Sequence, residues 1–256
     1  MSDYPEKPFV KFKLPCPKCG GSDPVSMHED RTAWCFSCST VIKDYDKECE
    51  AMPPSTTKPI DIQPYRNNAM NNAEGEFLAL SDRGISLDSA KKYGVKAVKD
   101  HKGQIVKHLY PYYVANEIVG YKVREQNKMF TWKGSGQGSG LFGEQLFQSG
   151  GKYITIVEGE CDAMAAYEML GSKWPVVSIK NGAAAAVKDV KNSIEFLEKF
   201  DCVVINFDND KPGKEAAKKV AMLLTPGKAK VVHLADDFKD ANDMIKKGNK
   251  HGYVTA

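Results

Sequence analysis

The cysteines near the N-terminus have the spacing of a metal site. Cys16 and Cys19 form one C-x-x-C pair, fifteen residues follow, and Cys35 and Cys38 form a second pair. Each pair places two thiolates on one tight turn, and two such turns supply the four ligands of a tetrahedral Zn²⁺ ion. Because four protein ligands leave no position for water, we expect one structural zinc that holds a small β-ribbon.

Carboxylates that follow apolar runs form a second group of chemically active residues. Glu158 follows the run 153–157, and Asp208 and Asp210 follow the run 203–207. In a parallel sheet the carboxyl ends of the strands share one edge, where ligands bind, so these acids are expected to meet. Buried carboxylates without partners are costly, and Mg²⁺ prefers oxygen ligands. We therefore expect a magnesium site for phosphoryl chemistry.

Two other acids, Asp162 and Asp240, are candidate supporting carboxylates near the same strand ends. An alternative is that the acids of this region cap helices, since Asp and Glu favour the first helical turn and Pro212 suits position N1. That alternative does not exclude metal binding. For Asp240 a solvated turn is a further alternative.

Apolar runs and helical patterns alternate in the second half of the chain. The runs cover residues 153–157, 176–179, 203–207 and 231–234, and the helical stretches lie near 161–170, 184–199 and 213–224. This alternation is typical of a parallel sheet covered by helices. We therefore expect an α/β fold in this half.

The segment before it combines a helix with antiparallel strands. Ser86 is a suitable N-cap for a helix that ends near Gly94. Residues 105–113 and 117–125 are rich in Ile, Val and Tyr and flank a turn at 115–116, which indicates an antiparallel pair. The pattern predicts a mixed α+β subdomain.

Three cations belong to this subdomain. Lys122 and Arg124 fall on one face of the second strand, and Lys128 follows shortly after it. They could bind phosphates, or they could form a solvated strand face. The glycine- and serine-rich run 134–140 is expected to be a mobile loop.

Composition describes an ordinary soluble protein. The 256 residues are 42% hydrophobic and 27% charged with a net charge of +3, so nucleic-acid contacts must depend on local patches. Cysteines without an export signal fit a reducing cytosol, and no apolar run approaches the ~20 residues of a membrane span. We expect a zinc ribbon over 1–50, a flexible linker over 51–72, the α+β subdomain over 73–150 and the α/β subdomain over 151–256.

Several of these motifs resemble a known family. Glu158-Gly159-Glu160-x-Asp162 and Asp208-x-Asp210-x-x-Gly213 resemble the Toprim motif of primases, topoisomerases and some nucleases. The four-cysteine ribbon and the segments Ala79-Leu80-x-x-Arg83-Gly84-Ile85-Ser86, Tyr121-Lys122-Val123-Arg124, Leu141-Phe142-Gly143 and Asn181-Gly182-Ala183 are similar to the primase half of the T7-like bacteriophage primase-helicases.

The resemblance implies synthesis of short RNA primers from nucleoside triphosphates (NTPs) on a single-stranded DNA template. It implies that Glu158, Asp208 and Asp210 coordinate one or two catalytic Mg²⁺ ions, with Mn²⁺ as an alternative, and that Asp162 and Asp240 support them.

For the other candidate residues the resemblance implies binding roles. Lys122, Arg124 and Lys128 would hold the triphosphate and the template backbone, and Asn181 would lie near the active site.

In the zinc ribbon, Asp30, Arg31 and Trp34 would read the start site on the template, although Trp34 could instead pack on the ribbon. Thr32 stands where the family leads us to expect histidine, which puts the template triplet in doubt.

The implied partners include a DNA polymerase and a replicative helicase module. No G-x-x-x-x-G-K-[ST] loop occurs in these 256 residues, so the chain is either a piece of a longer protein or a primase without a helicase. We expect it in the cytoplasm, that of the host if a phage encodes it. Alternative functions are a Toprim-type nuclease and a non-catalytic DNA-binding scaffold.

Overall fold

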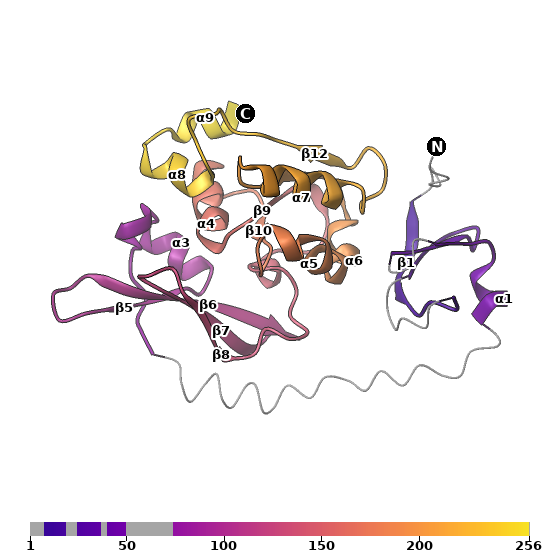
Figure 1. Cartoon of the computed structure of the whole chain (residues 1–256), viewed down its shortest axis with the longest axis horizontal. Coiled ribbons are helices and arrows are strands. Elements are labelled where there is room, and N and C mark those ends of the chain that lie inside the picture. Colours follow the sequence, from indigo (N-terminus) through magenta and orange to yellow (C-terminus); the bar gives the residue numbers. More distant parts are fainter. Residues whose placement is uncertain (1–7, 19–24, 37–39, 50–73, 256) are drawn as a thin grey trace.

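The computed structural model describes residues 8–18, 25–36, 40–49 and 74–255 (Figure 1). Within these ranges the strands form three four-stranded sheets. The expected linker over 51–72 lies outside the described residues.

The N-terminal sheet is antiparallel, with its strands in sequence order. It consists of β1 (Phe9–Leu14), β2 (Val25–His28), β3 (Ala33–Cys35) and β4 (Thr40–Ile42), followed by α1 (Tyr45–Cys49). Its small core contains Cys16, Val25 and Ile42, all fully buried. We call residues 8–49, as far as the structure describes them, the N-terminal module.

The second sheet is an antiparallel meander of β5 (Lys96–Lys99), β6 (Ile105–Val114), β7 (Glu117–Glu125) and β8 (Phe130–Gly134). The pairing of β6 with β7 confirms the predicted hairpin. Its turn residues, Ala115 and Asn116, have φ angles of 49° and 65°, as the tight hairpin turn requires. The sequence patterns did not predict β5 and β8.

The predicted helix before this sheet is α3 (Leu87–Lys92). The hydroxyl of Ser86 caps it by accepting a hydrogen bond from the Ser89 amide at 3.2 Å. The chain leaves the helix through Gly94, whose φ is 71°.

The third sheet is parallel and confirms the predicted α/β fold. Its strands are β9 (Gly151–Val157), β10 (Val176–Ser178), β11 (Phe200–Asn206) and β12 (Ala229–Val231), in the order β10-β9-β11-β12. Val157 lies opposite both Ser178 and Asn206. The residues that follow these strands therefore meet at one edge.

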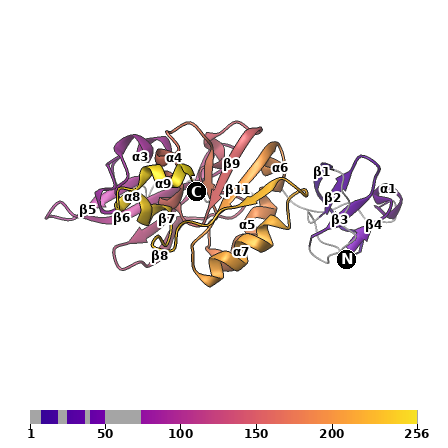
Figure 2. The same cartoon turned by 90° about the horizontal axis from the view of Figure 1, so that it is seen from above.

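Helices cover both faces of the parallel sheet (Figure 2). They are α4 (Glu160–Met169), α5 (Ala186–Asn192), α6 (Ile194–Leu197), α7 (Lys211–Ala221), α8 (Ala241–Lys246) and α9 (Lys250–Thr255). Ile156 and Ile205 share a core with α5, α6 and α7, whereas Val157 shares one with α4 and α8.

The helical stretch predicted near 184–199 is present, but it is divided into short segments. A 3₁₀ turn (Ala183–Ala185) precedes α5, and Ser193 separates α5 from α6. The Ser193 hydroxyl donates to Glu144 at 2.5 Å, and the backbone of Ser193 departs from helical angles at that point. A tertiary hydrogen bond therefore accompanies the break.

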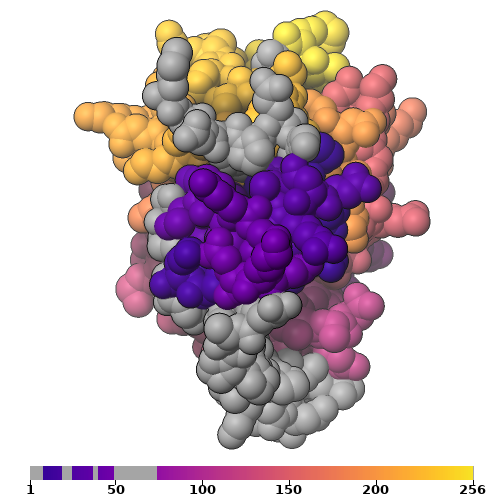
Figure 3. Space-filling model, turned by 90° about the vertical axis from the view of Figure 1, so that its right-hand side faces the viewer, coloured from indigo at the N-terminus to yellow at the C-terminus, as the bar shows by residue number. Residues whose placement is uncertain are grey.

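The N-terminal module lies against α5 and α6. Figure 3 shows this module, in indigo and purple, facing the viewer in front of the rest of the chain. Phe12 and Phe36 pack against the core on that side of the parallel sheet. The Lys191 ammonium donates to the carbonyl of Phe36 and lies 5.6 Å from the centre of its ring. Among the described residues, no helix has the length and apolar character that crossing a membrane requires.

Candidate active site

A cavity of about 690 Å³ opens at the carboxyl ends of β9 and β11. Eight of the predicted site residues line it, namely Lys122, Arg124, Lys128, Glu158, Asp162, Asn181, Asp208 and Asp240. The antiparallel sheet supplies the first three, and the parallel sheet with its following loops supplies the others. The fold therefore places predicted cations and predicted acids around one space.

Glu158 follows β9 directly and lines the cavity. Its Oε1 accepts a hydrogen bond from the Ala183 amide at 3.2 Å. Its Oε2 is buried and has no hydrogen-bond partner within the described part of the chain. Burial raises the pKa of Glu158, and the charge of Asp208 raises it further. A buried carboxylate oxygen without a donor is costly unless a ligand or cation supplies one.

Asp208 follows β11, and its side chain is 13% exposed. Burial raises its pKa, although the Lys239 ammonium at 2.5 Å opposes that change. Lys239 also lies 3.4 Å from Asp240. Despite its own desolvation, the pKa of Lys239 is raised by Asp208 and Asp240. The sequence analysis did not predict Lys239 as a site residue. The signal that could have indicated it was its position next to Asp240.

Asp162 and Asp240 belong to the same group of charges. Burial raises the pKa of Asp162 well above its usual value, and the charges of Asp240 and Asp208 add to the effect. Asp162 accepts the Asn242 amide at 3.0 Å. Asp240 lines the cavity and also caps α8 by accepting the Asp243 amide at 2.7 Å, so it is not a plain solvated turn.

Asp210 differs from the other predicted ligands. It is exposed, does not line the cavity, and caps α7 by accepting the Gly213 amide at 2.9 Å. The capping alternative is therefore correct for this residue. Its charge still raises the pKa values of Glu158 and Asp208. Gly213 is required because a Cβ there would lie 2.3 Å from the Asp208 carbonyl oxygen.

Glu158 and Asp208 suit Mg²⁺ chemically, because their carboxylates have raised pKa values and Glu158 has one buried oxygen without a partner in the described part of the chain. In the described part of the chain, however, no three Asp, Glu, His or Cys side chains form a ready-made metal cluster. The Lys239 ammonium instead neutralises Asp208. A divalent cation would have to compete with this ammonium.

Lys122 does not project freely into the cavity. Its ammonium lies 2.7 Å from Glu160 Oε1, donates to the Lys180 carbonyl and lies 4.6 Å from the centre of the Phe130 ring. Glu160 also accepts the Tyr112 hydroxyl at 2.7 Å. Sequence reasoning placed Glu160 in a motif without giving it this role, since the partners are far apart in the chain.

Arg124 is partly exposed, Lys128 is exposed, and both line the cavity as predicted. Arg83 also lines it, and this residue was not predicted as a site residue. The signal for Arg83 was its place in one of the family-like segments. Asn181 follows β10, and its backbone amide donates to Asp189 at 3.1 Å.

The predicted template-reading residues lie on the N-terminal module and not among the residues that line the cavity. Arg31, with a φ of 69°, lies in the β2–β3 turn and pairs with Asp46 at 3.4 Å. Asp30 accepts the Thr32 hydroxyl at 2.6 Å. Trp34 is part of β3 and is half-buried.

Two of the four predicted zinc ligands, Cys16 and Cys35, are fully buried in the N-terminal module. The Lys18 amide points at Cys16 Sγ from 3.4 Å, a geometry that stabilises a thiolate. These features fit a zinc ligand pair. Cys19 and Cys38 lie outside the described residues.

Comparisons with known proteins agree with this architecture. Residues 155–245 match the Toprim-like family model. The crystal structure of the primase fragment of the bacteriophage T7 primase-helicase protein is similar to this structure, with a TM-score of 0.66 and 31% sequence identity. The match covers 96% of this chain and 98% of that one. The chain belongs to the T7-like primase-helicase family. The predicted family and its Toprim fold are thereby confirmed.

Other members of the primase-helicase family align less completely. Over 237 residues the chain is 34% identical to the DNA helicase/primase of Enterobacteria phage T3, covering 91% of this chain and 40% of that protein. The T7 gp4 primase domains seen with the T7 lagging-strand DNA polymerase, an RNA/DNA hybrid and dTTP are 32% identical. That match has a TM-score of 0.64 and covers 73% of this chain and 93% of the other. The chain thus spans less than half the length of its T3 relative.

Proposed function

We propose that this protein is a DNA primase that makes short RNA primers from NTPs on a single-stranded DNA template. One observation carries the proposal: Glu158, with its unpartnered buried oxygen, and Asp208 share a cavity with the cations Arg124 and Lys128. Acids of raised pKa can take up divalent cations, and the cations can take up phosphates. Family membership favours primer synthesis over the other reactions of such a site.

In this proposal Glu158, Asp208 and Asp210 hold one or two Mg²⁺ ions, with Mn²⁺ as an alternative. Bound Mg²⁺ supplies positive charge near the attacking hydroxyl and the leaving pyrophosphate. Asp210 joins through the carboxylate oxygen that does not cap α7, because only Oδ1 accepts the Gly213 amide.

The other residues of the site bind and position the substrates. Arg124 and Lys128 bind the triphosphate and the template backbone. Lys122 assists them while Glu160 fixes its position, and Asn181 lies at the rim. The carboxylates of Asp162 and Asp240 attract the Lys239 ammonium. They allow this ammonium to leave Asp208 when a metal binds.

The N-terminal module is proposed to bind one structural zinc through Cys16, Cys19, Cys35 and Cys38. Asp30, Arg31 and Trp34 then read the template start site, because an arginine fork and an aromatic face suit unpaired bases. We retain the boundaries 1–50, 51–72, 73–150 and 151–256 for the ribbon, linker and two subdomains.

The partners follow from the family. We propose a replicative helicase module and a DNA polymerase as partners, since the T3 relative is a helicase/primase and the T7 primase domains were seen with a DNA polymerase. Because those relatives come from bacteriophages, we place the activity in the cytoplasm of the host cell.

Primer synthesis from labelled NTPs on single-stranded templates with Mg²⁺ tests the proposal. The variants Glu158→Gln and Asp208→Asn should each lose about a thousandfold or more in rate, because several kcal/mol of charge stabilisation depend on these oxygens. Asp201→Asn is the matched control: this exposed carboxylate lies on β11 at the far end from the cavity, and its loss should change little.

Each outcome of this assay assigns a function. RNA products with full activity in both acid variants would refute the assigned centre. Shortened templates in place of primers would indicate a nuclease, and binding without any reaction would indicate a scaffold.

The zinc proposal has its own test in Cys35→Ser. Because Cys35 is fully buried in the N-terminal module, its replacement should release zinc and impair initiation more than extension of a supplied primer. Metal analysis and the two rates measure this effect. Equal losses of initiation and extension would contradict a separate template-reading module.

A further inference from the structure

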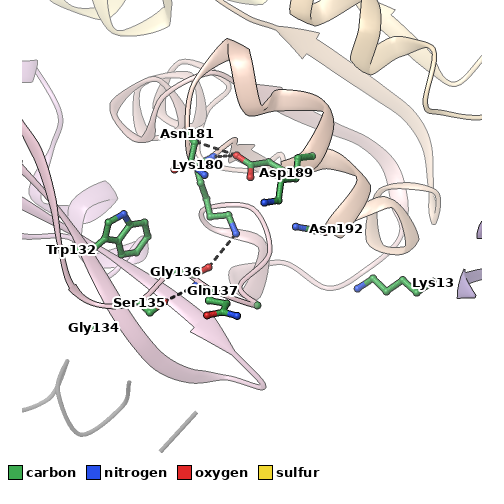
Figure 4. A pocket seen from close by; sticks show the side chains of 12 residues that line it. Lys13, Trp132, Gly134, Ser135, Gly136, Gln137, Lys180, Asn181, Asp189 and Asn192 are labelled. Carbon is green, nitrogen blue, oxygen red and sulfur yellow. Dashed lines mark hydrogen bonds between the residues drawn. The ribbon is translucent and has the colours of Figure 1, made fainter. Parts of the chain in front are cut away.

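Two buried charges beside the candidate active site hold the chain's own backbone. The Lys180 ammonium donates to the Gly136 carbonyl at 3.3 Å and to the Ser139 carbonyl at 2.6 Å. Figure 4 shows this lysine reaching the loop that contains Gly136, and it shows Asp189 beside the backbone of Asn181. Both groups are therefore accounted for by the fold.

The buried imidazole of His108, on β6, differs because both of its ring nitrogens contact side chains. Its Nε2 lies 3.1 Å from Asp82 Oδ1, and its Nδ1 lies 3.0 Å from the Tyr110 hydroxyl. An ionised carboxylate only accepts hydrogen bonds, so Nε2 donates its proton to Asp82. The side chain of His108 is 3% exposed, and these two hydrogen bonds fix the orientation of its ring.

The hydrogen-bonded chain continues from this ring to helix α4. The Tyr110 hydroxyl lies 3.2 Å from the sulfur of Cys161, which is next to Asp162. Burial raises the pKa of the Cys161 thiol to about 12, so the sulfur is a neutral hydrogen-bond partner and not a nucleophile. At the other end of the chain, Asp82 belongs to a 3₁₀ turn (Ser81–Arg83). The imidazole therefore joins this turn to the helix that begins at the active-site cavity.

Asp82 lies where it can hold the side chain of its neighbour Arg83. Its second oxygen, Oδ2, is 3.5 Å from Arg83 Nε, which is buried and has no hydrogen-bond partner in the described part of the chain. Burial opposes ionisation of Asp82, but the hydrogen bond from His108 and the charge of Arg83 lower its pKa. The carboxylate is therefore charged at neutral pH and attracts the guanidinium of Arg83, which lines the active-site cavity.

The backbone of Arg83 is fixed separately from its side chain. Its carbonyl accepts the side-chain amide of Asn242 at 2.8 Å, and the backbone amide of Asn242 donates to Asp162 at 3.0 Å. Because the main chain is held, the direction of the guanidinium depends on Asp82, and the direction of Asp82 depends on His108. A guanidinium that is held in advance binds a phosphate group with a smaller loss of side-chain freedom.

We propose that His108 is a positioning residue of the candidate active site. Through Asp82 it holds the Arg83 guanidinium towards the active-site cavity, where this guanidinium meets a phosphate group of the NTP or of the nucleic acid. The inference rests on the proposed function, to which it adds a buried residue that acts only through its neighbours.

Binding of magnesium-ATP and of a single-stranded oligonucleotide, each measured without synthesis, tests the proposal. His108→Leu removes the donor to Asp82 and should weaken the binding of at least one of these ligands roughly 2- to 12-fold, the range for loss of one hydrogen bond. The ligand that is affected identifies the source of the phosphate. Asp82→Asn should have a similar effect. His108→Gln should retain most of the affinity, because its side-chain amide can donate to Asp82.

The same substitution combined with Arg83→Ala shows whether His108 acts through the arginine. In the Arg83→Ala background, His108→Leu should cause no further loss of affinity, since the guanidinium that it positions is absent. The matched control is Thr225→Val, which removes a buried hydrogen bond to Glu198. Neither of these two residues lines the active-site cavity, so both affinities should stay unchanged.

Unchanged affinities for both ligands in His108→Leu and Asp82→Asn would overturn the proposal. A loss of the same size in the Arg83→Ala background would also overturn it, because that loss would reflect a general effect on the fold. Either outcome, in a protein that makes primers, refutes this inference alone. The expected losses of affinity in a protein that makes no primers would refute the proposed function instead.

Discussion

Two carboxylates of one short motif, Glu158 and Glu160, have opposite environments. Glu160 is buried between the Lys122 ammonium and the Tyr112 hydroxyl, both at 2.7 Å. Glu158, two residues earlier, keeps a buried oxygen without a partner in the described part of the chain. The contrast separates buried charges around β7 and β10 that are paired, which we call the wall, from an acidic centre at β9 and β11, where Lys239 pairs with Asp208 but Glu158 Oε2 has no partner among the described residues.

The difference shows which region of the molecule contains unfavourable interactions between charged groups. The buried charges of the wall, Lys122, Lys180 and Asp189, all have partners close to them. Glu158, Asp162 and Asp208 instead have raised pKa values, since burial and mutual repulsion disfavour their ions. Removing a charge should therefore destabilise the wall and relieve the centre.

The largest expected effect comes from breaking the pair in the wall. Glu160→Gln should lower the free energy of unfolding by about 3–5 kcal/mol, because it leaves the buried Lys122 ammonium without a carboxylate. Urea unfolding at neutral pH measures this loss.

The double variant K122M/E160Q is the control, since removing both charges should restore most of the stability. A loss below about 1 kcal/mol in Glu160→Gln would contradict the contrast between the two regions.

A medium effect is expected when Mg²⁺ is added to the acidic centre. At a free concentration ten times its Kd, Mg²⁺ should stabilise the protein by about 1.4 kcal/mol, because it binds the folded state. Thermal unfolding should shift by roughly 2–4 °C per kcal/mol. Glu158→Gln and Asp208→Asn should abolish the shift, and Asp201→Asn should retain it. An equal shift in all of these variants would place the metal elsewhere.

The smallest effect is a pH dependence without divalent cations. The folded pKa values of Glu158, Asp162 and Asp208 are raised. Below the ordinary carboxylate pKa of about 4 these groups are protonated in both states and cost nothing. As the pH rises towards the raised values, only the unfolded state releases these protons freely, so stability falls.

The variant Glu158→Gln isolates this contribution from other carboxylates. Its stability relative to the unsubstituted protein should increase as the pH is raised from about 4, as followed by urea unfolding. A constant difference across that range would mean that Glu158 is not held in an unfavourable charged state.

Much of the fold followed from local patterns. The alternation of apolar runs and helices predicted the parallel sheet, and the turn at 115–116 predicted the hairpin. Strands β5 and β8 were missed. Half of β5 is lysine, and β8 contains exposed residues and runs into the glycine-rich loop, so their pairing with β6 and β7 outweighs a weak pattern.

The sequence predicted acids and cations of the candidate site, but it did not predict which of them form ion pairs. Lys239 and Arg83 were missed although each has a signal in the sequence, because their contribution to the cavity depends on how distant segments pack. The mobility of the loop 134–140 stays a prediction, although Lys180 anchors the segment.

The sequence by itself determined the residue types, the strand ends that carry the acids and the spacing of the cysteines, because these depend on neighbours along the chain. Only the tertiary structure decided that Glu160 pairs with Lys122 while Glu158 keeps an unpartnered oxygen, and that Lys239 pairs with Asp208. The physical reason is that burial and Coulomb energies depend on distances between groups far apart in the sequence, which local patterns do not encode.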